Sequence, residues 1–466
     1  MDPLEAISPI DGRYLKYTKP LFDYFGEVAS MKYRVIMEGE YLIALSETKQ
    51  TGLRLFSEAE KTLIRNIYEF TVEDARIVDA IEFKGYKNLK ATNHDFKAIE
   101  YFIKDKLSET SVKDCLEWIH FGLTTWDAAH IAHTLMISEC LRDVYIPALE
   151  DIAAKIGALA DASAHIPMLA RTHGQPASPT TFGKEFRIFH ARLVRQLEQL
   201  KKHTLQAKLN GATGNYNALV AAYPMVDWIA FSKNFIAHLC TARKVDMKVN
   251  LLTTQIEPYD SYAELFDMMH RVNTILIGFD QDVWRYVSDG WLAQKPVEGE
   301  VGSSTMPHKI NPWFLENSEG NLGLANALLS FFSNKLPISR LQRDLSDSTV
   351  LRNVGVAFGH CLVGMAYLAN QLGRISVNEV KAAKDLADHP EVIAEAIQTI
   401  LRREGVAMPY EKLKTLTRGK EVTLADMRAF VSELEVSAEV KEELLKITPE
   451  NYTGIAEKLA KGEIKP

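Results

Sequence analysis

The sequence predicts an all-α protein, a three-domain subunit with a central bundle of long helices. Gly and Pro number only 25 and 17 among 466 residues. Both fall below the roughly 7% and 5% of average proteins, which disfavours a turn-rich all-β chain. Apolar residues also recur at spacings of three and four along several stretches, as one face of a helix requires.

Three apolar stripes mark the predicted helices of the bundle. They cover residues 149–159, 182–200 and 265–287. Stripes of this length are far more often bundle core than a cofactor-binding surface, and their spacing suits helices packed at about 20°. We therefore assign these three stretches to the core.

The chain is long enough for about three domains at roughly 150 residues each. Its first and last segments carry shorter amphipathic stretches than its middle, with Asn378, Thr423 and Thr448 as candidate N-caps of helices. We predict an N-terminal helical domain, a central helical bundle and a C-terminal helical domain, which span residues 1–113, 114–365 and 366–466.

Charge and cysteine content disfavour several classes of protein. Lys and Arg total 54 against 61 Asp and Glu, a formal charge of -7, which argues against a nucleic-acid or membrane-surface binder. The four cysteines are widely spaced, so neither a disulfide framework nor a thiolate zinc site is indicated. The N-terminus has no export signal, and no stretch approaches the roughly 18 apolar residues of a membrane span. We expect a cytoplasmic protein.

Three breaks rich in Gly, Pro and Asn separate the predicted helices, at residues 171–179, 210–217 and 298–312. Polar side chains gather in these breaks. Loops at the ends of a bundle expose backbone donors that helices consume, so functional groups concentrate there. We expect the site at these loops.

The loop from Gly302 to Pro312 has the outline of an anion site. Its hydroxyl, cationic and amide side chains are Ser303, Ser304, Thr305, Lys309 and Asn311. Glycine lets backbone N–H groups approach a ligand closely, and a lysine lowers the pKa of a nearby hydroxyl. The spacing of a nucleotide-binding P-loop is absent from the sequence. A capped surface turn is the alternative interpretation.

Two histidines lie in polar loop contexts. His173 sits in a Pro- and Gly-rich break, and an imidazole that titrates near neutral pH suits acid and base chemistry, although a structural role is the alternative. His94 is flanked by an amide and a carboxylate, a weaker signal. His130 and His133 lie three apart on a predicted helix, but no third ligand follows at a persuasive spacing, so no metal site is predicted.

Two of these loops resemble the signatures of the fumarase/aspartase superfamily, and specifically of its adenylosuccinate lyase branch. They read Gly302-Ser-Ser-Thr-Met-Pro-His-Lys-Ile-Asn-Pro312 and Thr172-His-Gly-Gln-Pro-Ala-Ser-Pro179. Fumarases and argininosuccinate lyases carry other residues in place of His308, and typically THLQ in place of Thr172–Gln175. Further matches extend the resemblance over nearly the whole chain: Ser8–Tyr14, Thr92–Asp95, Thr254–Pro258 and Leu336–Asn353.

The resemblance implies a homotetramer in which the central helices of four subunits form a twenty-helix core and each active site draws on three subunits. It implies β-elimination of fumarate from adenylosuccinate, giving AMP, and from succinyl-aminoimidazole-carboxamide ribotide in purine biosynthesis. No cofactor or metal is implied. The alternatives are another fumarate-releasing lyase of the superfamily and a pseudoenzyme used only for assembly.

The resemblance also implies the roles of four catalytic residues. Ser303 would be the general base, and Lys309 would favour its alkoxide and stabilise the dianion that forms. His173 would be the general acid that protonates the departing nitrogen. Glu316 would hold the other ring nitrogen of that histidine.

A larger set of substrate contacts follows from the same motifs. The implied contacts are Arg13, Tyr14, Arg343, Ser348 and Arg352 toward the ribose phosphate, Asn93, His94 and Asp95 near the base and the reacting groups, and Gln255 and Thr305 near the succinyl part. Thr124, Thr125, Asn311 and Thr349 complete the predicted substrate-binding set. One departure stands out: where the family usually has Thr-Ser-Glu-Asp, this chain has Thr124-Thr125-Trp126-Asp127. Thr125 keeps a hydroxyl for a carboxylate, whereas Trp126 is expected to change the neighbouring packing or interface.

Overall fold

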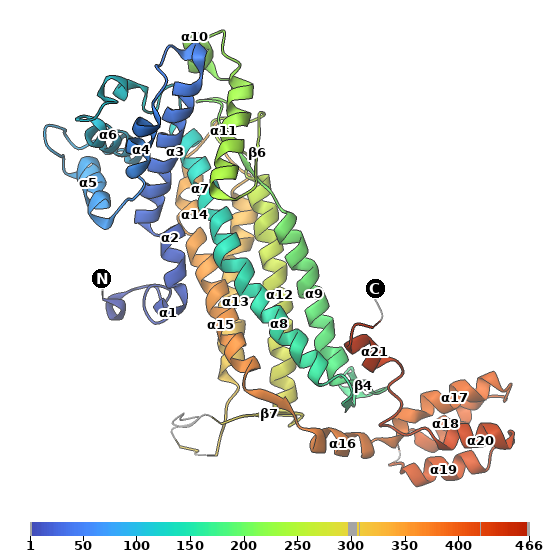
Figure 1. The fold of residues 1–466 in the computed structure, drawn as a ribbon. Helices are drawn as coiled ribbons and strands as arrows, with labels where there is room; N and C mark the ends of the chain where they lie inside the picture. The colour runs from blue at the N-terminus through green and yellow to red at the C-terminus, as the bar shows by residue number, and fades with distance from the viewer. Residues whose placement is uncertain (1, 297–304, 307, 420, 464–466) are drawn as a thin grey trace. The chain divides into compact units, whose positions relative to one another are not determined.

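The structure, a computed structural model, describes residues 2–296, 305–306, 308–419 and 421–463. The predicted all-α class is confirmed (Figure 1). β-Structure in the described residues is confined to two-stranded sheets with two or three residues per strand and one isolated bridge. These pairs are β1 (Pro167–Met168) with β4 (Thr180–Thr181), β2 (Arg171–Thr172) with β3 (Gln175–Pro176), β5 (Leu205–Ala207) with β6 (Met247–Val249), and β7 (Leu292–Gln294) with β8 (Ile375–Val377).

The helices follow one another along the whole described chain. The N-terminal helices are α1 (Leu15–Thr18), α2 (Phe22–Phe25), α3 (Glu27–Glu47), α4 (Glu58–Asn66), α5 (Val72–Phe83) and α6 (Asp95–Leu107). The middle of the chain forms α7 (Thr125–Cys140), α8 (Ile146–Ala162), α9 (Phe182–Lys202), α10 (Asn217–Ala222), α11 (Trp228–Arg243), α12 (Asp260–Ser288), α13 (Trp313–Lys335), α14 (Ser346–Leu351) and α15 (Val354–Leu372). The C-terminal helices are α16 (Glu379–Ala387), α17 (Ala394–Arg403), α18 (Pro409–Thr417), α19 (Leu424–Ser432), α20 (Ala438–Leu445) and α21 (Ala456–Ala460).

Contacts between residues divide the chain into two compact units, each assembled from three separate segments. Unit 1 consists of Met1–Leu149, Leu197–Thr274 and Asn321–Val363. Unit 2 consists of Glu150–Gln196, Ile275–Gly320 and Gly364–Pro466. The expectation of three domains stays a prediction.

The three apolar stripes form helices as predicted. They fall in α8, α9 and α12, and their apolar residues are buried or half-buried. In α9, for example, Phe182, Phe186 and Leu193 are at most 1% exposed. The helical spacing of three and four therefore located real core faces.

In unit 1, α3 is the element around which the N-terminal helices gather. It contacts α4, α5, α6 and α7, and most of its residues are buried. Tyr41 of α3 lies edge-on against Phe231 and Phe235 of α11, with ring centroids 5.8 Å apart in both pairs. Edge-to-face aromatic pairs of this kind join α3 to α11.

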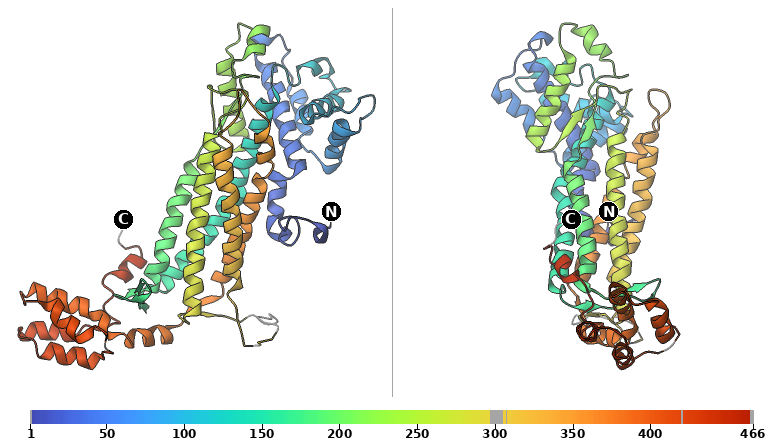
Figure 2. Two further views of the ribbon diagram at one scale, coloured as in Figure 1. Left: turned by 180° about the vertical axis from the view of Figure 1, so that it is seen from behind. Right: turned by 90° about the vertical axis from the view of Figure 1, so that its right-hand side faces the viewer.

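In unit 2, the short helices α17 to α20 lie side by side near the end of the chain (Figure 2), and they share one hydrophobic cluster. The predicted N-caps Asn378 and Thr423 are confirmed: Asn378 Oδ1 accepts from the backbone of Lys381, and Thr423 Oγ1 accepts from Asp426. The prediction for Thr448 was wrong. Its backbone N–H donates to Asn451 Oδ1 in a turn, and the next helix begins only at Ala456.

One stretch, Ser346–Leu372, is long and apolar enough by composition to cross a membrane, contrary to the expectation that none is. Two helices, α14 and α15, share this stretch. About two thirds (67%) of its most apolar window is buried inside the protein. A core helix of a bundle has this character, because it is apolar on nearly all sides.

Candidate active site

His173 lies at the tip of a two-residue hairpin in unit 2. β2 and β3 pair through Thr172 and Gln175, so His173 and Gly174 alone make the turn. Both have positive φ, 55° and 77°, as a type I′ turn requires at both central positions. Glycine meets that requirement freely and histidine only at some cost. The turn leaves the His173 side chain exposed.

Arg171, the first residue of β2, supports the turn of this hairpin. The Arg171 guanidinium donates to the carbonyl oxygen of Gly174 at 3.2 Å and lies over the Trp291 ring, 5.8 Å from its centroid. A cavity of about 390 Å³ opens beside these residues. The hairpin is therefore a supported element that exposes one imidazole at its tip.

The second predicted loop is described only in part. The predicted base Ser303 lies outside the described residues. Lys309 is exposed, with its backbone N–H bonded to the Met306 carbonyl at 3.1 Å. Thr305 is also exposed, and Asn311 is half-buried, two residues before α13 begins.

Glu316 stands in the first turn of α13 in unit 2. Its Oε1 accepts from the indole N–H of Trp284 at 3.1 Å. Among the described residues no hydrogen bond joins Glu316 to His173. The predicted contact between Glu316 and His173 stays a prediction.

The loop before α6 gathers three predicted substrate contacts in unit 1. Asn93 has positive φ (48°), and the Nδ1 atom of His94 caps α6 by accepting from the Lys97 backbone at 3.2 Å. Asp95 accepts from Arg34 Nη1 at 3.0 Å. Burial alone raises the pKa of the Asp95 carboxyl, but the Arg34 charge and the Phe96 N–H outweigh burial and hold that pKa below its usual value.

The start of α7 is fixed by a buried ion pair. The side chains of Asp127 and Lys208 are fully buried and lie 2.5 Å apart, and the Asp127 carboxylate also accepts from the backbone N–H groups of Asn210 and Gly211. These bonds satisfy the buried carboxylate. The same carboxylate accepts from the Thr124 backbone N–H at 3.0 Å, and Thr124 Oγ1 accepts from Gln255 Nε2 at 3.4 Å. Two predicted substrate contacts thus meet here.

Trp126 is 4% exposed and belongs to a closed network in unit 1. Its indole N–H donates to the Tyr259 hydroxyl at 2.6 Å, and that hydroxyl donates to Asp347 Oδ2 at 3.1 Å. Asp347 Oδ1 lies 3.7 Å from Arg343, whose guanidinium carbon sits 3.8 Å from the centroid of a Trp126 ring. The larger side chain is accommodated by an aromatic and cationic stack.

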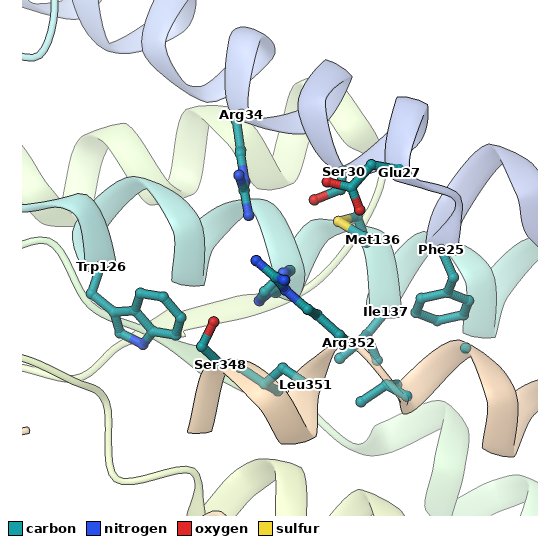
Figure 3. Close-up of a pocket in the computed structure, with 13 residues that line it drawn as sticks. Phe25, Glu27, Ser30, Arg34, Trp126, Met136, Ile137, Ser348, Leu351 and Arg352 are labelled. Atoms are coloured by element: carbon teal, nitrogen blue, oxygen red, sulfur yellow. The ribbon is translucent and has the colours of Figure 1, made fainter. Parts of the chain in front are cut away.

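Ser348 and Arg352 line one cavity of about 110 Å³ in unit 1 (Figure 3). Ser348 belongs to α14, and Arg352 follows the last residue of that helix. The same cavity is lined by Arg34 and His133, which the family resemblance did not single out. The structure therefore brings two of the predicted phosphate contacts together.

The four remaining predicted substrate contacts of unit 1 lie in turns or at helix positions that are exposed or half-buried. Arg13 lies in an exposed turn, and Tyr14 is the N-cap residue of α1. Thr125 is the first residue of α7 and is half-buried, whereas Thr349 is exposed on α14.

His130, which is buried, and His133, which lines the cavity, are both uncharged at neutral pH. Burial lowers the pKa of His130 to about 4 and that of His133 to about 3. His130 Nε2 bonds to the Gln206 carbonyl at 3.0 Å. No group of three or more potential metal-ligating side chains occurs in the part of the chain that the structure describes.

Sequence reasoning missed Arg34, Lys208, Tyr259 and Asp347. Asp347 lies within Leu336–Asn353, a segment that resembles the family. The resemblance thus indicated the region of Asp347 but not its role. Arg34 and Lys208 lie in helical or strand-flanking stretches without a motif. Only the fold reveals their partners, which are 61 and 81 residues away along the chain.

Comparison with known proteins identifies relatives along nearly the full chain. Residues 12–326 match the family model described as "Lyase", and residues 339–453 match "Adenylosuccinate lyase C-terminal". Adenylosuccinate lyases of Legionella pneumophila (strain Corby) and Dictyostelium discoideum are 46% and 47% identical to it, covering 98% of this chain and 98% and 97% of theirs. That of Escherichia coli (strain K12) is 43% identical, with 98% of both chains covered.

Solved structures with lower identity share the fold. A fumarate lyase from Mesorhizobium sp. BNC1 matches with a TM-score of 0.72 at 17% identity, covering 95% of this chain and 97% of that one. A 3-carboxy-cis,cis-muconate lactonizing enzyme from Pseudomonas putida matches with a TM-score of 0.71 at 19% identity, covering 95% of both chains. These matches place the chain within a helical lyase fold.

Proposed function

This chain belongs to the adenylosuccinate lyase family, and on that premise we propose how its residues divide the work of the reaction. The chain has adenylosuccinate lyase activity: it releases fumarate from adenylosuccinate and leaves AMP. The observation that carries this function is identity of 43–47% to adenylosuccinate lyases over 98% of the chain. We extend it to succinyl-aminoimidazole-carboxamide ribotide, the second purine-pathway substrate.

The demanding step is removal of a proton from a carbon beside a carboxylate. The carbanion that forms adds a second negative charge to a group that already carries one, so preorganised donors must stabilise it. Ser303 takes this proton. Lys309 and the Asn311 amide stabilise the dianion, and the ammonium group of Lys309 favours the alkoxide form of the serine.

The carbon–nitrogen bond then breaks, and the departing nitrogen needs a proton. His173 supplies it as general acid. Support for this role comes from the hairpin, which exposes the imidazole at its tip and holds it on a turn with positive φ. Backbone strain of this kind clusters at functional sites. In the assembled protein, Glu316 of one subunit orients the His173 ring of another.

We propose a homotetramer as the active form. Along α13, Leu324 and Phe331 are 56% and 53% exposed, Ala327 between them is exposed, and so is Gly323 just before them. An exposed stripe of apolar and small residues on one helix face suits close packing against another helix. The partner is a second copy of this chain, and assembly would bring Glu316 of one copy to His173 of another.

We also propose that the protein acts in the cytoplasm. Its four cysteines are free thiols, and three of them, Cys115, Cys140 and Cys361, are buried. A reducing compartment preserves such thiols.

An ultraviolet assay of the purified protein tests the activity. Adenylosuccinate, argininosuccinate and fumarate are supplied as separate substrates, and we expect turnover of adenylosuccinate alone. Turnover of argininosuccinate or hydration of fumarate at a greater rate would assign the chain to another lyase of the superfamily. Absence of turnover with all three by correctly folded tetramer would favour a pseudoenzyme.

A further inference from the structure

Two guanidinium groups face the same small cavity in unit 1. Arg34 comes from α3 and Arg352 follows α14, and in Figure 3 the two side chains point toward one another. Ser348 contributes a hydroxyl beside them. Glu27 is the one carboxylate among the residues that line this cavity, so its lining carries two fixed cations against one anion.

Arg34 has hydrogen-bonding capacity that the protein leaves unused. Its side chain is 9% exposed. Nη1 donates to Asp95, whereas Nε is buried without a hydrogen-bond partner. A buried donor without an acceptor costs free energy, and a bound anion is one way to satisfy it.

A second unsatisfied group borders the cavity. The His133 ring is among its lining residues, and Nδ1 of that ring is buried without a partner. The ring can present an N–H to an anion or accept from a ligand hydroxyl. Two buried, unpaired nitrogens on α3 and α7 thus border one small space.

We propose that Arg34 is a phosphate-binding residue of this site, and that through its bond to Asp95 it links the bound phosphate to the loop of Asn93, His94 and Asp95. The ligand is the 5′-phosphate monoester of the nucleotide substrate. A guanidinium has five N–H donors, so Arg34 can keep Asp95 on Nη1 and still donate to a phosphate oxygen. This inference rests on the proposed function.

The link has a catalytic consequence. Asp95 and its neighbours are expected near the base and the reacting groups, whereas the phosphate lies at the far end of the substrate. When the phosphate binds, Arg34 is held between phosphate and Asp95, and the loop is held with it. Binding energy from a remote group is thereby used to orient the reacting end.

Arg34→Met tests the proposal with two substrates that differ only in the phosphate, adenylosuccinate and succinyladenosine. We expect the ratio of kcat/KM for adenylosuccinate over succinyladenosine to fall at least tenfold. Arg34→Lys should recover part of the ratio, because an ammonium keeps the charge but lacks the fork. Arg352→Ala is the positive control and should also lower the ratio.

A binding measurement keeps the test independent of turnover. Calorimetric titration with AMP and with adenosine should show that Arg34→Met weakens the binding of AMP at least tenfold and the binding of adenosine much less. Arg243→Met is the matched control, because it removes a guanidinium from another buried carboxylate, Glu139, in the same unit. The phosphate preference of Arg243→Met should equal that of wild type.

Three outcomes would overturn the inference. Equal losses on both substrates would mean that Arg34 only supports Asp95. No loss on either substrate would mean that Arg34 does not meet the phosphate, and an equal fall of the phosphate preference in Arg243→Met would mean that the effect is a general loss of stability. Failure of wild type to cleave adenylosuccinate would instead contradict the proposed function, so the two failures are distinguishable.

Discussion

The guanidinium carbon of Arg343 lies 3.8 Å from the centroid of a Trp126 ring. This contact places an aromatic face where the family usually has a carboxylate. The Arg343 guanidinium is attracted to this ring, because the face of an indole carries negative electrostatic potential. Asp347 lies 3.7 Å from the same guanidinium, so Arg343 has both an aromatic and a carboxylate partner.

Substitution of Trp126 should affect substrate binding in a graded way. Trp126→Phe keeps a ring face and should raise KM for adenylosuccinate only a few-fold, whereas Trp126→Ala should raise it by about tenfold or more, from loss of up to about 2 kcal/mol of cation–π energy. Trp126→Glu restores a carboxylate and should fall between them. Steady-state kinetics with melting temperatures check this order. A Phe variant as impaired as the Ala variant would contradict it.

His173→Ala and Ser303→Ala should each lower kcat by several orders of magnitude and leave folding and KM nearly unchanged. Proton transfers contribute in the transition state, so their loss appears in kcat. Ser304→Ala is the neighbouring control and should be much milder. Near-normal kcat in either main variant would remove that residue from its role, and a severe Ser304→Ala defect would transfer the base to Ser304.

Mixing His173→Ala with Ser303→Ala should restore part of the activity if each site draws on more than one subunit. A hybrid tetramer then contains some sites with both intact residues. The measurement is fumarate release after the two inactive proteins have exchanged subunits, with exchange verified by mass spectrometry of differently tagged chains. No recovery after verified exchange would mean that each site is built within one chain.

Acid should destabilise the protein partly through His130. Its folded-state pKa of about 4 lies below the roughly 6.5 of an unfolded histidine, so the unfolded chain binds more protons between these values. Stability from this residue is present above pH 6.5 and is lost, by about 1.4 kcal/mol per pH unit, as pH falls toward 4. Denaturant midpoints at fixed protein concentration should therefore decline less steeply for His130→Gln. Parallel curves would refute this contribution.

Lys208→Met should lower the free energy of unfolding by about 3–5 kcal/mol, because it leaves the buried Asp127 carboxylate without its cation. Both side chains are fully buried, so water cannot replace the lost partner. Lys208→Met combined with Asp127→Asn should recover part of the loss. Chemical unfolding at one protein concentration measures both. A cost below about 1 kcal/mol would show that solvent reaches the site.

The sequence allowed the helical class and the bundle helices to be predicted because periodicity is a local property. The stripe from Phe182 to Leu200 needs no knowledge of its partners to be recognised as a buried face. Caps are local too, which is why Asn378 and Thr423 were placed correctly. Thr448 has the same residue type, and its backbone N–H donates to Asn451 Oδ1, but only a turn follows it.

Contacts between distant segments could not be predicted in this way. The bond between Arg34 and Asp95 joins α3 to the start of α6, and the Asp127 pair joins α7 to a strand end. Neither pair lies at a fixed sequence separation that would allow it to be recognised from the sequence. Likewise, motif matching located His173 but not the positive φ of its turn, because several turn types accept a His-Gly pair and the paired strands select one.

The interleaved composition of the two units bears on how the chain folds during synthesis. Unit 1 needs the segment Asn321–Val363 to close around Met1–Leu149. At about 5–20 residues per second, the ribosome reaches that segment on the order of 10–35 s after completing the first one. During this interval the nascent N-terminal helices lack part of their packing surface and are exposed to aggregation. A chain released early, before residue 321, could complete neither unit, so we expect truncated translation products to be substrates for chaperones and proteases.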